Sequence, residues 1–139
     1  DGKDFINQVK HREYFRPFAG TILHEYAHEW FDMRGLDESP HMMYAMYCNE
    51  GYKEKIPCIV HEDDTCRIQT LKREQNPVFY DMIEYFHQHT GIPILFNTSF
   101  NLAGEPLVET IEDAIVTLLN SKIEYLYLPD NDLVLKIKN

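Results

Sequence analysis

Residues 76–101, NPVFYDMIEYFHQHTGIPILFNTSFN, have the pattern of a capped helix, a short break and a buried strand that ends in polar residues. Asn76 is a good helix N-cap, and Pro77 suits the first turn of a helix. Apolar residues then repeat at helical spacing until Gly91, a residue typical of helix ends. Residues 92–96 have the length and composition of a buried strand. A helix that leads directly into a buried strand indicates a protein that contains both helices and a sheet.

The rest of the chain predicts further strands and helices around this centre. Residues 65–71 alternate, with Cys66 and Ile68 on one side and Arg67 and Gln69 on the other, which fits a strand with one wet face. The other expected elements are a helix at 4–10, an extended segment at 18–23, a helical or irregular segment at 26–31, strands at 42–47 and 56–60, a helix opened by Thr110, and strands at 125–128 and 133–137. The predicted class is α/β, bordering on α+β, with a mixed sheet.

Length and composition limit the possible functions. The 139 residues fit a single domain over the whole chain. A net charge of -10 argues against nonspecific binding to nucleic acid or to an anionic membrane. No apolar run approaches the roughly 20 residues that span a bilayer, and the first residues are unlike a signal peptide. The three cysteines show no C-x-x-C spacing, so they are interpreted as reduced thiols in a cytoplasmic protein.

A basic cluster stands out against this acidity. Lys10, Arg12 and Arg16 fall within seven residues. In a chain this acidic, such a concentration is best explained by one specific anionic ligand. The planar arginine side chain matches carboxylate or phosphate oxygens two at a time. The alternative is that these cations pair with Glu13 and other acids on a solvated helix face.

A polar run follows the buried strand and contains Asn97, Thr98, Ser99 and Asn101. Ligands usually bind beyond the carboxyl ends of strands in open α/β sheets. Amide side chains both donate and accept hydrogen bonds, and hydroxyl groups bond phosphate oxygens. Together with the basic cluster and Arg67, the run predicts a pocket for a small ligand with both phosphate and amide character. The alternative is that the run only caps a turn.

His24, Glu25 and His28 match the pattern H-E-x-x-H. On a helix this pattern places two imidazoles on one face for zinc, with the glutamate as general base. Glu29 follows where zinc-protease helices usually keep a neutral residue, and Pro17 leaves little room upstream for a long helix. No third ligand follows at the expected spacing. A zinc-dependent hydrolase is therefore the least favoured interpretation, and we expect no metal site in this chain.

Three segments of the chain, together with its terminal strand region, resemble in order and spacing the C-terminal domain of the O-carbamoyltransferases, which include the nodulation-factor and antibiotic carbamoyltransferases. The three segments are INQVKHREYFRPFA at 6–19, IVHEDDTCRIQT at 59–70, and the stretch at 76–115. The first carries the signature K-x-R-x-x-x-R-P-F, and the third carries N-T-S-F-N-x-x-G-E-P. The resemblance covers nearly the whole chain.

The resemblance implies a fold and a reaction. The C-terminal domain of this family looks like the YrdC fold of the tRNA threonylcarbamoyl-adenylate synthases, a twisted open sheet with flanking helices. It takes carbamoyl phosphate and ATP, with Mg²⁺ expected alongside the ATP, and makes carbamoyl-adenylate. A larger N-terminal domain of the same polypeptide, with a metal site of its own, then passes the carbamoyl group to a hydroxyl acceptor. On this basis the chain is expected to be a fragment that transfers nothing by itself.

The resemblance also implies roles for individual residues. By motif position, the phosphates would be bound by Lys10, Arg12, Arg16 and Arg67, and the carbamoyl and phosphate groups would be held by Asn97, Ser99 and Asn101. Thr98 completes the substrate-binding set that the polar run predicts. The expected catalytic residues are Lys10, Arg16, Arg67 and Ser99. Fixed cations would stabilise the charge that grows on phosphate or pyrophosphate as it leaves.

Some residues depart from the family pattern. Gly20 stands where proline is usual, Asp64 where glycine is usual, and Cys66 where alanine is common. Asp64 adds a negative charge beside Arg67 and is expected to weaken anion binding. The alternative from another class is a noncatalytic nucleotide- or phosphate-binding module with the same fold.

Overall fold

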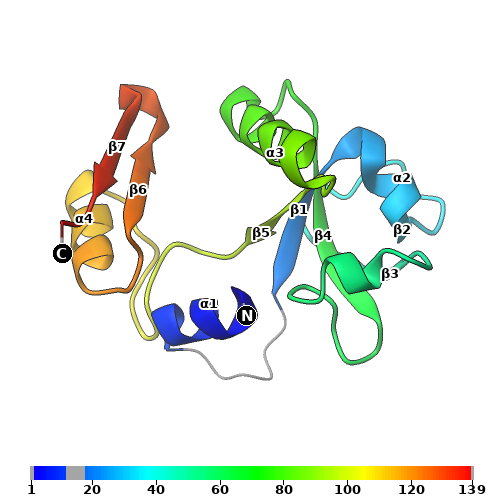
Figure 1. Ribbon diagram of the computed structural model, residues 1–139, viewed down its shortest axis with the longest axis horizontal. Helices are drawn as coiled ribbons and strands as arrows, with labels where there is room; N and C mark the ends of the chain where they lie inside the picture. Colours follow the sequence, from blue (N-terminus) through cyan, green and yellow to red (C-terminus); the bar gives the residue numbers. More distant parts are fainter. Residues whose placement is uncertain (1, 12–17, 139) are drawn as a thin grey trace. The chain divides into compact units, whose positions relative to one another are not determined.

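The computed structural model describes residues 2–11 and 18–138 of the chain (Figure 1). The chain divides into two compact units. The sheet unit comprises residues 17–98, and the terminal unit comprises residues 1–16 and 99–139. The expectation of one domain over the whole chain stays a prediction.

The sheet unit is built on a five-stranded mixed sheet with the strand order β2-β3-β4-β1-β5. Strand β1 runs parallel to β4 and antiparallel to β5, and β3 pairs antiparallel with both β2 and β4. The strands are β1 (Ala19–Leu23), β2 (Phe31–Asp32), β3 (Ala45–Cys48), β4 (Thr65–Leu71) and β5 (Ile94–Asn97). This sheet and the helices of the chain confirm the predicted α/β class with a mixed sheet. The likeness to the YrdC fold stays a prediction.

The helix predicted after Asn76 is confirmed as α3 (Pro77–Thr90). Asn76 Oδ1 accepts a hydrogen bond from the backbone N–H of Phe79 at 3.1 Å, which satisfies one of the open donors of the first turn. Gly91 ends the helix with a φ of 73°, a conformation that glycine adopts without steric penalty. In Figure 1, α3 lies along the sheet beside β1 and β5.

Strand β1 is buried along its whole length, and its alternate residues face two different cores. Ile22 belongs to the larger core, together with Met46 of β3 and Ile68 of β4. On the opposite face, Leu23 packs in a smaller core with Ile83 of α3. The alternation predicted for residues 65–71 is confirmed, because β4 spans these residues and its exposed positions lie on one face only.

The prediction of a strand at residues 56–60 is wrong. These residues form turns, in which Val60 makes only an isolated bridge to the sheet. Ile56 and Ile59, three positions apart, are both buried in the larger core. Pro57 lies between them and has no N–H to offer to a sheet ladder. Apolar residues in a turn can therefore mimic a strand in the sequence when they pack into a core.

The other predicted elements of the sheet unit lie near their expected places. The strand predicted at 42–47 begins only at Ala45, and Met42 upstream of it has a φ of 53°, outside the β region. The segment expected to be helical or irregular at 26–31 is helical up to residue 30. The short helical elements are η1 (His24–Tyr26), α2 (Ala27–Trp30) and η2 (Lys53–Lys55).

Within residues 2–11 and 99–138, the terminal unit contains two α-helices and a separate two-stranded sheet. The helix predicted to open at Thr110 is confirmed and begins with a capping box. Thr110 Oγ1 accepts a hydrogen bond from the Asp113 backbone at 3.1 Å, and Asp113 Oδ2 accepts one from the Thr110 backbone at 3.2 Å. The elements are α1 (Gly2–Lys10), α4 (Ile111–Leu119), β6 (Tyr125–Leu128), η3 (Pro129–Asn131) and β7 (Leu133–Lys136).

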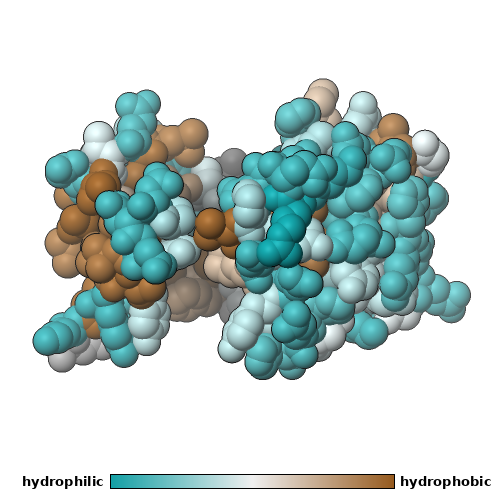
Figure 2. Space-filling model, turned by 90° about the horizontal axis from the view of Figure 1, so that it is seen from above, coloured by the Kyte–Doolittle hydropathy of each residue, from teal (hydrophilic) through white to brown (hydrophobic). Residues whose placement is uncertain are grey.

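Apolar side chains are exposed on the terminal unit. Figure 2 shows hydrophobic residues gathered over the surface formed by α4, β6 and β7, and the large exposed side chains there include Ile111, Val116, Leu119, Tyr125 and Val134. These residues belong to short elements. Within residues 2–11 and 18–138, no helix combines the length and the apolar composition that a bilayer span requires.

Gly20 of β1 generates a prediction about packing. A Cβ atom at this position would lie 2.6 Å from Ile59 Cδ1 and 2.9 Å from Ile94 Cγ2, well inside normal contact distance. We expect Gly20→Ala to lower the free energy of unfolding by roughly 1–3 kcal/mol, measured by urea denaturation. Ile59→Val removes the closest atom, so the double variant should lose less stability than the sum of the two single variants. A Gly20→Ala variant as stable as the parent protein would contradict this close packing.

Candidate functional site

Lys10, the last residue of α1, is 9% exposed and lies beside the polar run. Its Nζ donates to the carbonyl oxygen of Ser99, to Ser99 Oγ at 3.0 Å and to Asn101 Oδ1 at 3.1 Å. These contacts join residues that are 89 and 91 positions apart in the sequence. We call Lys10, Ser99 and Asn101 the lysine cluster. The structure thus brings the first cation of the basic cluster together with two members of the polar run.

Hydrogen bonds fix the orientation of the Asn101 amide in the lysine cluster. Its Nδ2 donates to the carbonyl oxygen of Glu105 at 2.9 Å, so its Oδ1 faces Ser99 and Lys10. Ser99 Oγ donates to that oxygen at 2.7 Å. A buried ammonium group interacts more strongly with an anion than an exposed one does, because water screens it less. The donors of the Lys10 ammonium and of the Ser99 hydroxyl group are all used within the lysine cluster, so a phosphate oxygen would bind here by replacing one of these acceptors.

A second set of polar residues lies on one face of the sheet in the sheet unit. The strand register places Arg67 of β4 and Asn97 of β5 on the two sides of Ala19 in β1. Residues paired across neighbouring strands project from the same face of a sheet, so Arg67 and Asn97 share a face. Because adjacent strands are about 4.8 Å apart, the Cα atoms of these two residues are roughly 10 Å apart. Farther along the same face, Leu23 and Leu71 form the apolar core under α3.

Thr21 and Gln69, which are paired in the register of β1 and β4, hold the side chain of Asn97. Asn97 Nδ2 donates to Thr21 Oγ1 at 2.8 Å and to Gln69 Oε1 at 3.0 Å, and it lies 3.9 Å from Met42 Sδ. Thr21 Oγ1 also donates to Gln69 Oε1 at 3.1 Å. We call Asn97, Thr21 and Gln69 the amide relay. Thr21 and Gln69 are not among the site residues predicted from the sequence, although the alternation of residues 65–71 places Gln69 on the same face as Arg67.

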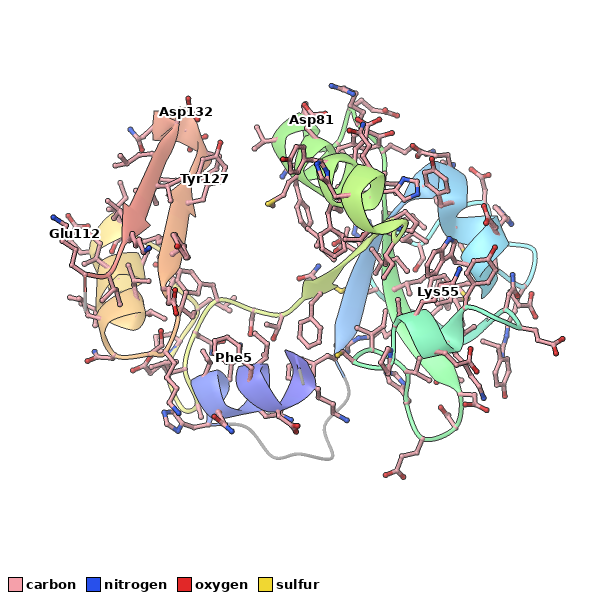
Figure 3. The ribbon with its side chains drawn as sticks, in the orientation of Figure 1. Phe5, Lys55, Asp81, Glu112, Tyr127 and Asp132 are labelled. Atoms are coloured by element: carbon pink, nitrogen blue, oxygen red, sulfur yellow. The ribbon has the colours of Figure 1, made fainter. Side chains whose placement is uncertain are left out.

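Arg67 differs from the other cations of the sheet unit. Each other Lys or Arg residue within residues 18–98 has a partner. Lys53 pairs with Asp64, Lys72 with Glu38 and Arg73 with Asp81, while Arg34 lies over the ring of Tyr47 and Lys55 over those of Trp30 and Tyr52. Lys55 and Asp81 are labelled in Figure 3. Arg67 is exposed and forms no ion pair or side-chain hydrogen bond with any described residue. Its guanidinium group is open to an anion from solution.

Asp64, one of the departures from the family pattern, has a φ of 62°. Its Oδ1 lies 3.1 Å from Lys53 Nζ, and this hydrogen bond raises the pKa of Lys53. Hydrogen bonds from the side chain and the backbone of Thr65 lower the pKa of the neighbouring Asp63. Both carboxylates therefore have partners of their own in the turn before β4. The expected weakening of anion binding at Arg67 stays a prediction.

The structure describes only part of the predicted site. Arg12 and Arg16 lie outside the described residues, so their roles stay predictions. Thr98 is half-buried and makes no side-chain hydrogen bond with a described residue. Lys10, Ser99 and Asn101 come together in the terminal unit, and Arg67 shares a sheet face with Asn97 in the sheet unit.

The H-E-x-x-H motif does not lie on one continuous α-helix. His24 and Glu25 belong to η1, whereas His28 lies in the four-residue helix α2. Glu25 accepts a hydrogen bond from the Tyr80 hydroxyl group, and this bond raises the pKa of Tyr80 to about 12. Among the residues that the structure describes, no group of three or more His, Cys, Asp or Glu side chains is placed to hold a metal ion.

The three cysteines are free thiols. Cys66 lies in the larger core, and burial is the main cause that raises the pKa of its thiol to about 12. Burial also raises the pKa of the half-buried Cys48. A thiol that stays protonated is a poor nucleophile. Cys66 is therefore suited to packing rather than to catalysis.

The carbamoyltransferase C-terminus family matches residues 1–136 of the chain. The chain belongs to this family, and the resemblance predicted from the sequence is confirmed. It is 41% identical to nodulation protein NolO of Bradyrhizobium diazoefficiens over 126 residues, which cover 89% of this chain. It is 39% identical to nodulation protein NolNO of Sinorhizobium fredii over 124 residues, or 88% of the chain. An uncharacterized protein of Methanocaldococcus jannaschii is 38% identical over 138 residues, or 99% of the chain.

These relatives are much longer than the matched segment. The alignments cover 23% of NolO, 18% of NolNO and 26% of the Methanocaldococcus protein. The chain thus spans about a quarter or less of the length of the relatives that it matches.

The placement of His24 and His28 generates a prediction about zinc. Because the two histidines lie in different short helical elements, purified protein should contain far less than one zinc per chain in elemental analysis. The double variant His24→Ala, His28→Ala should have the same metal content as the parent. A stoichiometric zinc that the double variant loses would revive the hydrolase interpretation.

The raised pKa of Cys66 generates a prediction about reactivity. At pH 8, iodoacetamide should modify Cys66 more slowly in the folded protein than in urea-unfolded protein by a factor on the order of 10³, because so little thiolate is present. Peptide mass spectrometry at timed intervals measures the rate at each cysteine. Equal rates for Cys66 in the two states would contradict its burial as a protonated thiol.

Proposed function

We propose that this chain binds carbamoyl phosphate and ATP and forms carbamoyl-adenylate, for transfer to a hydroxyl acceptor by another domain of a longer protein. Membership of the carbamoyltransferase C-terminus family supports a role in carbamoyl transfer. The observation that carries the more specific proposal is the lysine cluster. It joins the lysine of one family signature to the serine and asparagine of the other, through hydrogen bonds at 3.0 Å and 3.1 Å.

The charges of the substrates explain why cations are needed. Carbamoyl phosphate and ATP both carry negative phosphate groups, and the chain has a net charge of -10 that repels them. Lys10 in the terminal unit and Arg67 in the sheet unit are proposed to bind phosphate oxygens. Arg12 and Arg16 belong to the same proposal by motif position. Mg²⁺ is proposed to accompany the ATP, because this ion is held largely by substrate phosphates and water.

The proposed overall reaction uses one molecule of water. Carbamoyl phosphate, ATP and water give carbamoyl-adenylate, inorganic phosphate and pyrophosphate. Negative charge grows on the oxygens of each leaving group, and cations fixed in place stabilise that charge without reorganising. Ser99 Oγ, which is held beside Lys10, donates to Asn101 Oδ1 in this structure, and its hydroxyl group is proposed to turn from that acceptor to the same phosphate oxygens when the substrate binds.

The lysine cluster generates a prediction about turnover. Lys10→Ala and Ser99→Ala should each reduce the release of pyrophosphate that depends on carbamoyl phosphate by about 10²-fold or more, because each removes a donor to the transition state. Lys122→Ala is the matched control in the same unit, since this exposed lysine only donates to Gln8 Oε1 at 3.4 Å. Melting temperatures of all variants check that they remain folded.

The outcomes separate the proposal from its alternative. Binding of ATP and carbamoyl phosphate without pyrophosphate release would support a noncatalytic nucleotide-binding module instead. Undiminished pyrophosphate release by both Lys10→Ala and Ser99→Ala would remove the lysine cluster from the reaction.

A further inference from the structure

One arrangement of donors and acceptors satisfies every member of the amide relay. Gln69 Nε2 donates to the carbonyl oxygen of Pro40 at 3.0 Å, so Gln69 Oε1 points toward the other two side chains. That oxygen accepts from Thr21 Oγ1 at 3.1 Å and from Asn97 Nδ2 at 3.0 Å, which uses both of its lone pairs. Thr21 Oγ1 in turn accepts from Asn97 Nδ2 at 2.8 Å. The backbone carbonyl of Pro40 therefore sets the direction of every hydrogen bond in the relay.

The Asn97 amide cannot turn over within this arrangement. Both hydrogens of its Nδ2 are already used, and the reversed amide would place Oδ1 against Gln69 Oε1, two acceptors facing each other. If Gln69 reversed as well, its Oε1 would face the carbonyl of Pro40. Thr21 is fully buried, so no water compensates for a broken bond at its hydroxyl group.

The fixed orientation presents Asn97 Oδ1 as an acceptor. No described residue donates a hydrogen bond to this oxygen, and it is not among the side-chain atoms that are buried without a partner. The register places Arg67 on the same face, on the other side of Ala19. One face of the sheet unit therefore offers a cation and an oriented acceptor whose Cα atoms are roughly 10 Å apart.

We infer that Asn97 Oδ1 accepts a hydrogen bond from the NH2 of a carbamoyl group, and that Thr21 and Gln69 are positioning residues which make this site selective for that group. The inference rests on the proposed function and adds the basis of its specificity. An acetyl group has nearly the same shape as a carbamoyl group but carries a methyl group in place of the NH2. An acetyl ligand would displace water from Asn97 Oδ1 and leave that acceptor without a partner, which disfavours it.

The test compares the binding of carbamoyl phosphate and acetyl phosphate by calorimetry. The parent protein is expected to bind carbamoyl phosphate about tenfold or more tightly than acetyl phosphate, the effect of one lost hydrogen bond at a partly buried acceptor. Thr21→Ser keeps the hydroxyl group and should keep this preference. Thr21→Val keeps the shape of threonine but removes the hydroxyl group, and Gln69→Leu removes the anchor to Pro40. Both should lose most of the preference while their affinity for acetyl phosphate changes little.

Each outcome decides a different point. If Thr21→Val and Gln69→Leu fold, as their melting temperatures show, and keep the parent preference, the relay does not position Asn97 and the inference is overturned. If either relay variant fails to fold, Asn97→Leu at a half-buried position replaces it, and a preference retained in that variant overturns the inference equally. A parent protein that binds carbamoyl phosphate and acetyl phosphate with equal affinity refutes the role of Asn97 Oδ1 as an acceptor but leaves the proposed function intact. A parent protein that binds neither refutes the proposed function, and the inference falls with it.

Discussion

The pairing of β1 with β4 on one side and β5 on the other is the constraint on which the rest of the sheet unit depends. Because β1 is buried on both faces, its register decides which residues enter each core. A slip of one residue would turn Thr21 toward the larger core and would turn Ile22 toward the opposite face of the sheet, which carries Arg67 and Asn97. The register that buries Ile22 is therefore the same register that assembles the amide relay. Folding stability and the proposed recognition of a carbamoyl group depend on one strand alignment.

Local signals in the sequence predicted the elements whose structure is determined locally. The caps Asn76 and Thr110 bond to backbone groups within their own first turns, so the starts of α3 and α4 could be predicted from a few residues. The residues of β4 alternate between buried and exposed because one face of the strand meets solvent, and that pattern is also local. The failure at residues 56–60 has a tertiary cause. Ile56 and Ile59 are apolar because turns carry them into a core that the local sequence does not reveal.

The same distinction explains which site residues could be predicted. The family signatures identified Lys10, Ser99 and Asn101, although their contacts across 89 and 91 positions of sequence come only from the fold. Thr21 carried no signal, because a threonine inside an apolar strand is consistent with simple burial. Its role follows from its alignment with Gln69, and strand register is a property of pairs of segments rather than of either segment alone.

Two asparagines illustrate how the direction of hydrogen bonds assigns a role to a side chain. In the terminal unit, the Glu105 carbonyl accepts a hydrogen bond from Asn101 Nδ2, so the amide oxygen of Asn101 accepts from Lys10 and Ser99. In the sheet unit, Thr21 and Gln69 accept hydrogen bonds from Asn97 Nδ2, and no described residue donates to the amide oxygen of Asn97. One amide oxygen therefore helps to hold a cation, while the other is the acceptor that we propose for a carbamoyl group. The difference does not come from residue type, because an asparagine can donate or accept until its neighbours fix its orientation. The backbone carbonyls of Pro40 and Glu105 at the ends of these networks therefore determine which atom each asparagine presents.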